Sequence, residues 1–259
     1  MNVRRPTERE PGTLLVSGGG RGIGAATARL AAARGWDVAV NYARDAAAAE
    51  TVAADVRALG RRALVLQAEV GDDAAVRAMF AELDRAWGAH SLGGLVVNAG
   101  VVDVAARVDE MDAARVERMF RINVFGAFSC AREALRRMGT KHGGAGGAIV
   151  NVGSAASRVG SPGQYVDYAA SKGAIDTFTL GLAREVAAEG VRVNCVRPGI
   201  IDTEIHASGG QPERALQAAP QLPMQRAGHA DEVAAAIVWL LSDAASYVNG
   251  ALLDVSGGR

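Results

Sequence analysis

The stretch that decides the fold is "VSGGGRGIGAATARLAAARG", Val16 to Gly35. It joins the end of an apolar, strand-like run to an alanine-rich, helix-like run. Gly18, Gly22 and Gly24 have the spacing G-x-x-x-G-x-G, and glycines allow a sharp turn that brings the main chain close to a ligand. The helix that follows would direct free N–H groups and the positive end of its dipole at an anion. An ordinary glycine-rich turn would carry the same letters, but the strand before it and the helix after it favour binding of a nucleotide diphosphate.

Strand-like and helix-like runs alternate along the rest of the chain. The expected strands are Thr13–Ser17, Trp36–Tyr42, Arg62–Val70, Leu92–Gly100, Gly147–Ser154, Val191–Gly199 and Ala251–Gly258. The expected helices are Gly22–Arg34, Ala46–Leu59, Asp73–Trp87, Ala113–Met138, Tyr165–Glu189 and Ala230–Ser242. This alternation predicts parallel strands with helical crossovers on both faces of one open sheet. The fold class is therefore α/β, a three-layer Rossmann fold with a doubly wound parallel sheet of about seven strands.

No linker or change of composition divides the chain, so we expect a single nucleotide-binding domain over residues 13–259. Residues 1–12 are polar and are expected to form a flexible N-terminal lead-in. Residues 202–228 have no clear periodicity and are expected to form a substrate loop, in which Gly209 and Gly210 supply a hinge. We expect no added substrate domain after Arg259.

The bulk composition excludes several classes of partner. The formal net charge is +0, which gives no support for nucleic acid or an anionic membrane surface. No apolar run approaches the roughly 20 residues that cross a bilayer. Cys130 and Cys195 form no pattern with the histidines, so we expect buried thiols and a cytoplasmic location. No two histidines lie at ligand spacing, so no metal site is expected.

The end of the second strand bears on the choice of coenzyme. A fold of this type that selects NAD usually has an acidic residue there, which holds the ribose hydroxyls. Here Asn41 and Tyr42 stand at that place, with Arg44 just beyond and Arg21 inside the glycine turn. Two guanidinium groups suit the 2′-phosphate of NADP. The alternative is that both arginines are ordinary solvated surface residues, which the sequence does not distinguish. The sequence favours NADP and leaves NAD open.

The stretch "YVDYAASK", Tyr165 to Lys172, contains the candidate acid/base. Tyr168 and Lys172 lie at i and i+4 and therefore share one face of a helix. A phenol with an ordinary pKa of about 10 is too weak an acid for this work near neutral pH, but a neighbouring ammonium favours the phenolate. Such a phenol can exchange a proton with an alcohol or carbonyl oxygen while hydride moves at the adjacent carbon. Ser154, at the carboxyl end of a strand, is the candidate second donor; a turn cap is the alternative role.

Taken in order, these motifs resemble the classical short-chain dehydrogenase/reductase family, nearest to its sugar-dehydrogenase-like and ketoacyl-reductase-like branches. The resemblance covers Thr13 to the end of the chain and rests on "SGGGRGIG", "VNAG", "INVFG", "NVGS", "YAASK" and "RPGIIDT". It implies a catalytic tetrad of Asn123, Ser154, Tyr168 and Lys172. It also implies 4-pro-S hydride transfer and a homotetramer, with a homodimer as the alternative.

The resemblance also implies a set of coenzyme contacts. The main-chain carbonyl of Asn123 would hold a water that links Lys172 to solvent, although Asn123 could simply cap or bend its helix. Residues from the glycine turn, the strand ends and the segment after the sixth strand would bind the coenzyme: Gly18, Gly20, Arg21, Gly22, Ile23, Gly24, Asn41, Arg44, Glu69, Val70, Asn98, Ala99, Gly100, Tyr168, Lys172, Pro198, Gly199, Ile201 and Thr203.

Several positions depart from the family pattern. Ser17 replaces the usual threonine before the turn, and its hydroxyl can make the same local bond. Glu69 stands where aspartate is usual, which leaves its contact with the adenine in doubt. Val97 stands where a second asparagine is frequent. The spacing from Ser154 to Tyr168 is one residue longer than the commonest form, which a bulge before Tyr165 would absorb.

The expected function is NADP(H)-dependent interconversion of a small alcohol and its carbonyl, with a sugar or polyol as one candidate. His206, Gln164 and Met224 could face the substrate or belong to the surface. A protein that binds NADP as a sensor or scaffold without turnover is the alternative of a different class, and the filled tetrad argues against it. A nucleotide-sugar epimerase or dehydratase with the same tyrosine–lysine pair is a further rival, but such chains usually carry an added C-terminal domain.

Overall fold

The computed structural model describes residues 12–259, so the expectation for residues 1–11 lies outside the described part of the chain. Within that part, seven strands form one parallel sheet in the order β3-β2-β1-β4-β5-β6-β7. The strands are β1 (Thr13–Val16), β2 (Asp37–Tyr42), β3 (Ala63–Gln67), β4 (Leu92–Val97), β5 (Gly147–Val152), β6 (Val191–Pro198) and β7 (Leu252–Val255). The order reverses between β1 and β4, and in open α/β sheets that switch point is where a ligand binds.

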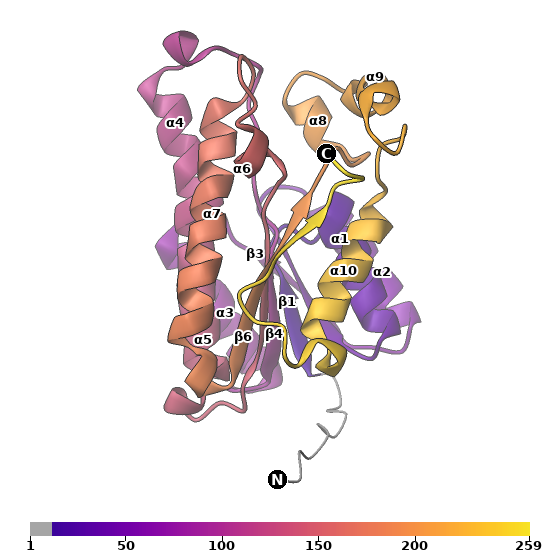
Figure 1. Cartoon of the computed structure of the whole chain (residues 1–259). Helices are drawn as coiled ribbons and strands as arrows, with labels where there is room; N and C mark the ends of the chain where they lie inside the picture. Colours follow the sequence, from indigo (N-terminus) through magenta and orange to yellow (C-terminus); the bar gives the residue numbers. More distant parts are fainter. Residues whose placement is uncertain (1–11) are drawn as a thin grey trace.

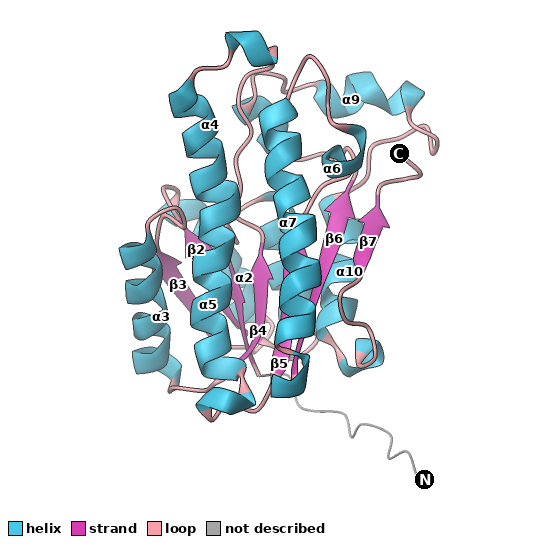
Figure 2. Ribbon diagram, turned by 60° about the vertical axis from the view of Figure 1, so that its left-hand side comes forward, coloured by secondary structure: helices cyan, strands magenta, loops and turns pink. Residues whose placement is uncertain are grey.

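Helices cover both faces of the sheet, as Figures 1 and 2 show. The helices are α1 (Gly22–Ala33), α2 (Ala46–Ala58), α3 (Asp73–Trp87), α4 (Ala113–Phe120), α5 (Gly126–Met138), α6 (Ala156–Val159), α7 (Val166–Glu185), α8 (Ile205–Ser208), α9 (Arg214–Ala218) and α10 (Ala230–Leu241). Short 3₁₀ turns occur at Val108–Glu110, Thr140–His142, Ala187–Glu189, Ala219–Gln221 and Asp243–Ala245. The predicted three-layer, single-domain Rossmann fold is therefore confirmed.

Two hydrophobic clusters hold the layers together, one on each face of the sheet. Side chains alternate between faces along a strand, so Leu15 joins the cluster under α3, α5 and α7, whereas Leu14 and Val16 join the cluster under α1, α2 and α10. The central strands are buried on both faces, which explains why their sequences read as nearly continuous apolar runs. Cys130 and Cys195 are buried in the first of these clusters, as expected, and burial raises the pKa of both thiols to about 12.

The expected single helix from Ala113 to Met138 is interrupted. A π-type turn occupies Arg121–Phe125, between α4 and α5, and the Gly126 N–H donates to the Arg121 carbonyl five residues earlier. Gly126 lies so close to the chain after β3 that an added Cβ would approach a Val70 methyl to 2.8 Å. The hydrophobic pattern of the two helices is continuous, so periodicity alone did not reveal the break. It falls at Asn123, and such turns often mark functional positions.

The segment predicted as a substrate loop without clear periodicity, residues 202–228, forms two short helices, α8 and α9, above the carboxyl ends of the strands (Figure 1). A parallel bridge between Ile201 and Gly228 joins its two ends. Among residues 12–259, no helix combines the length and the apolar character that crossing a membrane requires.

A buried ion pair fixes the start of α7. Arg115 on α4 donates to both carboxylate oxygens of Asp167, at 2.8 and 3.3 Å, and to the Val104 carbonyl at 2.7 Å. The Asp167 side chain is only 2% exposed. Asp167 immediately precedes Tyr168, so this pair sets the position at which the candidate acid/base enters the site.

Replacement of Asp167 by alanine would leave the Arg115 guanidinium without its carboxylate partner. We expect Asp167→Ala to lower the free energy of unfolding by about 3–5 kcal/mol, the usual effect of breaking a buried pair, measured by urea denaturation. Asp109→Ala is the control, because its pair with Arg107 is 71% exposed on both sides and should change stability by less than about 0.5 kcal/mol. Equal effects in the two variants would contradict the structural role of the Arg115–Asp167 pair.

Candidate active site

The glycine turn is held by a small polar network at the switch point of the sheet. The Ser17 hydroxyl accepts hydrogen bonds from the N–H groups of Asn98, at 2.9 Å, and Ala99, at 3.0 Å. The Asn98 amide donates to the carbonyls of Ser17 and Gly18, each at 3.0 Å. Serine at position 17 therefore makes the local bond expected of it, and Asn98 joins the ends of β1 and β4.

The turn itself requires glycine. Gly18 and Gly22 have φ of 61° and 51°, values that residues with a Cβ rarely adopt. At Gly24, a Cβ would lie 2.4 Å from the Gly18 carbonyl oxygen and 2.6 Å from the Asn98 amide nitrogen. No side chain caps α1, and no acidic residue lies in its first turn. Its N-terminal N–H groups thus remain available, and these features fit a diphosphate group.

A cavity of about 530 Å³ extends from this turn to the ends of β2 and β3. It contains most of the predicted coenzyme contacts: Gly18, Gly20, Arg21, Gly22, Ile23, Asn41, Arg44, Glu69, Val70, Asn98, Ala99, Gly100 and Thr203. Gly24 does not line it and instead packs behind the turn. Asp45 caps α2 by accepting from the Ala48 N–H at 3.0 Å.

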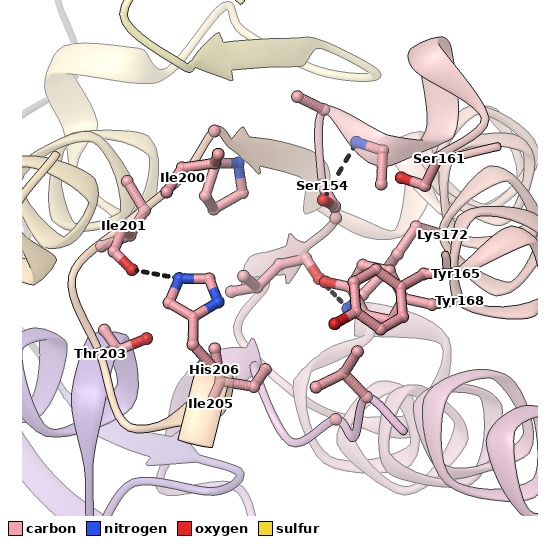
Figure 3. Close-up of a pocket in the computed structure, with 18 of the residues that line it drawn as sticks. Ser154, Ser161, Tyr165, Tyr168, Lys172, Ile200, Ile201, Thr203, Ile205 and His206 are labelled. Carbon is pink, nitrogen blue, oxygen red and sulfur yellow. Dashed lines mark hydrogen bonds between the residues drawn. The ribbon is translucent and has the colours of Figure 1, made fainter. Parts of the chain in front are cut away.

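A second cavity, of about 150 Å³, adjoins the first, and both are lined by Ile23, Asn98, Gly100 and Thr203. Figure 3 shows Ser154, Tyr168 and Lys172 along one side of it. Pro198, Gly199 and Ile201 line it as well. The structure therefore brings together three members of the predicted tetrad beside the nucleotide cleft.

The buried lysine is anchored by the sheet. Lys172 is 5% exposed, and its ammonium donates to the Val152 carbonyl at 2.7 Å. The same nitrogen lies 5.6 Å from the centroid of the Tyr168 ring. Ser154 Oγ accepts from the Ala156 N–H at 3.1 Å, so this side chain caps a turn and also lines the cavity. Both roles considered for Ser154 are thus compatible.

Asn123 lies behind the cavity rather than in its wall. Its carboxamide accepts from the Val101 N–H at 2.8 Å and donates to the Val101 carbonyl at 3.0 Å and the Ser171 hydroxyl at 3.1 Å. A Cβ on Gly100 would lie 3.3 Å from Asn123 Oδ1 and 3.6 Å from Lys172 Nζ. The side chain of Asn123 is therefore a tie between the π turn, the chain after β4 and α7.

Three residues that line the smaller cavity were not predicted from the sequence: Tyr165, Arg214 and Arg259. Tyr165, for which the sequence predicted no role in the site, is buried against the cavity beside Tyr168 (Figure 3). Tyr165 is the N-cap residue of α7, so its place just before Tyr168 in the sequence was the available signal. Arg214 and Arg259 also line the cavity, and no motif marks either of them.

Of the three candidate substrate contacts, only His206 lines the cavity. Its Nε2 lies 2.8 Å from the Ile201 carbonyl oxygen. Burial lowers the pKa of His206, although the bond to Ile201 opposes this, and the nearby Arg214 lowers it further. Gln164 and Met224 are exposed. Between Ser154 and Tyr168, the segment predicted to contain a bulge, the chain makes a turn in which Ser161 has φ of 46°.

Comparison with known proteins identifies the family. Residues 18–259 match a family model described as enoyl-(acyl carrier protein) reductase. An uncharacterized oxidoreductase of Escherichia coli, YgfF, is 56% identical over 95% of this chain and 98% of its own length. The chain belongs to the short-chain dehydrogenase/reductase family. It is an oxidoreductase of that family's type, and the resemblance drawn from its motifs is confirmed.

Other members of the short-chain dehydrogenase/reductase family are also similar. The cis-4-hydroxycyclohexanecarboxylate dehydrogenase of Sinomonas cyclohexanicum is 41% identical, over 94% of each chain. A solved short-chain dehydrogenase of Burkholderia cenocepacia, in complex with NADP, superposes with a TM-score of 0.87 at 34% identity. That match covers 96% of this chain and 98% of the other.

Asn41 lines the larger cavity, but hydrogen bonds within the fold hold its side chain. It is 1% exposed, accepts from the Gly18 N–H at 3.2 Å, and donates to the carbonyls of Leu66 and Ala68 at 3.2 and 3.1 Å. In an aspartate at this position, one carboxylate oxygen could still accept from the Gly18 N–H. The other oxygen would replace the amide nitrogen and would face the Leu66 and Ala68 carbonyl oxygens with no hydrogen to donate. Asn41 therefore holds the glycine turn against the ends of β2 and β3.

We expect Asn41→Asp to lower the free energy of unfolding by roughly 3 kcal/mol, because it buries a charge against acceptors, as measured by urea denaturation. Gln217→Glu, the same chemical change at an exposed position on α9, is the control and should leave stability within about 0.5 kcal/mol. A variant as stable as the parent that now preferred NADH would show instead that residue 41 faces the ribose.

Proposed function

We propose that this protein interconverts a small alcohol and its carbonyl compound with NADP(H), and that Tyr168 is the acid/base. The observation that carries the proposal is the shared wall of Ser154, Tyr168 and Lys172, in a cavity that adjoins a glycine-lined nucleotide cleft. When bound, the coenzyme supplies the hydride acceptor or donor. The remaining chemistry belongs to side chains of this chain.

In the oxidative direction, the alcohol loses its hydroxyl proton to the Tyr168 oxygen as its carbon loses hydride. The C=O bond forms, and both electrons of the C–H bond leave with the hydride. Ser154 donates a hydrogen bond to the substrate oxygen. The Lys172 ammonium, held at the Val152 carbonyl, stabilises negative charge on the phenolic oxygen. In the reductive direction, the same groups return the proton.

The preference for NADP rests on Arg21 and Arg44. Both are exposed and line the nucleotide cavity, and within residues 12–259 neither has a carboxylate within ion-pair distance. Asn41, at the end of β2, provides no carboxylate for the ribose hydroxyls. The solved relative from Burkholderia cenocepacia with NADP adds support. We further propose a homotetramer, from the family resemblance.

The proposal is tested by a substrate panel followed through NADPH absorbance. The panel contains sugars, polyols, ketones and ketoesters, together with cyclic hydroxy acids, because one relative is named as a hydroxycyclohexanecarboxylate dehydrogenase. We expect turnover of at least one class. Bound NADPH with no turnover across the panel would favour the alternative of a sensor or scaffold.

Tyr168→Phe removes the phenolic oxygen and leaves the ring. On any substrate that the panel identifies, we expect kcat to fall by at least about 100-fold, the usual contribution of a positioned acid/base, with NADPH affinity nearly unchanged. Tyr247→Phe is the matched control, because Tyr247 is fully exposed and should retain full activity. Unchanged turnover in Tyr168→Phe would refute the assignment.

Arg44→Ala tests the choice of coenzyme. The loss of a charge-assisted contact with the 2′-phosphate should weaken NADPH binding by about 10- to 100-fold and leave NADH affinity nearly unchanged, as measured by fluorescence titration. Arg34→Ala is the control, since Arg34 is also exposed but lies outside the cavity. Equal weakening of both coenzymes by Arg44→Ala would exclude a contact with the phosphate.

A further inference from the structure

The smaller cavity, which contains Ser154, Tyr168 and Lys172 and is called the catalytic cavity below, is also lined by positively charged groups that have no role in the proposed hydride transfer. Its ionisable lining consists of Tyr165, Tyr168, Lys172, His206, Arg214 and Arg259, and no aspartate or glutamate lines it. Lys172 is bound to the Val152 carbonyl and stands beside Tyr168, where the proposed chemistry needs it. The guanidinium groups of Arg214 and Arg259 have no part in that chemistry.

Neither guanidinium is neutralised by a carboxylate of the described chain. Arg214 donates to Gln211 Oε1 at 2.6 Å and lies over the Tyr165 ring, 5.1 Å from its centroid. Both arginines are half-buried, and within residues 12–259 no ion pair involves either one. Arg197, which is also half-buried, differs from them because it pairs with both Asp176 and Asp254.

The two groups also act on each other and on the histidine. Burial lowers the pKa of Arg259, and the charge of Arg214 lowers it further. Arg214 acts in the same direction on His206. Like charges gathered in a partly buried pocket are unfavourable until an anion enters, and a planar guanidinium is well suited to bind a carboxylate.

Segments distant in sequence deliver the two arginines. Arg214 comes from α9, and Arg259 from the turn after β7, which ends next to α8 and α9 in Figure 1. The Ser256 hydroxyl donates to the Arg259 carbonyl at 3.1 Å. A Cβ on Gly258 would lie 3.1 Å from Pro223 Cβ, so this turn packs directly on the segment that carries α9.

The coenzyme is a poor candidate for the anion. Its diphosphate belongs at the glycine turn and the N-terminus of α1, which border the larger cavity, and neither Arg214 nor Arg259 lines that cavity. The rest of the catalytic cavity is largely apolar, with Val102, Val159, Ile200 and Ile205 in its wall. The complementary ligand is therefore a small molecule with a hydrocarbon body and one anionic end.

We propose that the substrate is a hydroxy or oxo carboxylate, whose carboxylate binds Arg214 and Arg259 while its hydroxyl or carbonyl lies at Tyr168 and Ser154. This inference rests on the proposed function and specifies its substrate class. Binding fixes the distance between the anionic end and the reacting carbon, so affinity and orientation come from the same contact.

The first experiment compares oxo acids with their uncharged methyl esters, using 4-oxocyclohexanecarboxylate as the cyclic pair and 5-oxohexanoate as the linear pair. We expect kcat/KM for the better acid to exceed that for its ester by at least about 10-fold. Arg214→Gln and Arg259→Gln should each reduce kcat/KM for the acid by about 10- to 100-fold, mainly through KM, with little change for the ester. Arg34→Gln, remote from the cavity, should change neither.

A second readout does not depend on turnover. We expect cyclohexanecarboxylate to bind the protein loaded with NADP⁺, in isothermal titration calorimetry, and to bind both glutamine variants at least about 10-fold more weakly. Cyclohexanecarboxamide should not distinguish the variants. Carboxylate binding without turnover of any panel compound would sink the proposed function and retain the anion site. The anion site would be overturned if neither substitution changed the ratio of kcat/KM for the acid to that for its ester, or the affinity for cyclohexanecarboxylate. It would also be overturned if both variants bound NADPH more weakly by the same factor.

Discussion

The bonds between Ser17 and Asn98 are the constraint on which the site depends. They tie the carboxyl end of β1 to that of β4, at the one place where the strand order turns from one direction to the other. Because the chain leaves β1 and β4 toward opposite faces of the sheet, a crevice opens between them. The Asn98 amide also fixes the Gly18 carbonyl, and Gly24 packs on the same oxygen. A change at any of these positions would therefore move the phosphate cradle and the strand beneath the catalytic cavity together.

The catalytic half of the site is fixed by buried polar groups rather than by apolar packing alone. Asn123, Ser171 and Lys172 are each at most 5% exposed, and each has hydrogen-bond partners. Such networks are rigid when fully satisfied and costly when one member is removed. The π turn interrupts the regular helix, and it places the Asn123 carboxamide within hydrogen-bond distance of both Val101 and Ser171. Asp167, held by Arg115, supplies the same kind of restraint at the start of α7.

The sequence predicted most of the fold, and three of its predicted site residues, Ser154, Tyr168 and Lys172, line one cavity, for physical reasons that particular residues show. Strand and helix periodicity placed all seven strands to within three residues at either end, and the offset between Tyr168 and Lys172 is a local property of one helix. Asn41 shows the limit of such reasoning. Its position at the end of β2 suggested a coenzyme contact, but its bonds to Gly18, Leu66 and Ala68 depend on three segments that only the folded sheet assembles. Arg214 and Arg259 lie in segments without periodicity, so their convergence depends on the tertiary fold.

The same geometry separates the side chains that the strand ends bring to the cavity from those that residues 202–228 and the turn after β7 bring to it. Ser154, Tyr168 and Lys172, the groups of the proposed acid/base chemistry, come from the end of β5 and from the first two turns of α7, where backbone hydrogen bonds limit movement. His206, Arg214 and Arg259, which line the rest of the cavity, come from α8, α9 and the turn after β7. Loops on a rigid scaffold change their side chains with little effect on stability. Gly257 and Gly258 pack against Met224 and Pro223, so the last turn of the chain, which carries Arg259, is tied to residues 202–228, the segment that carries Arg214. In the proposed function, substrate selection therefore depends on α8, α9 and the turn after β7 together, whereas the acid/base chemistry depends on the sheet edge beneath them.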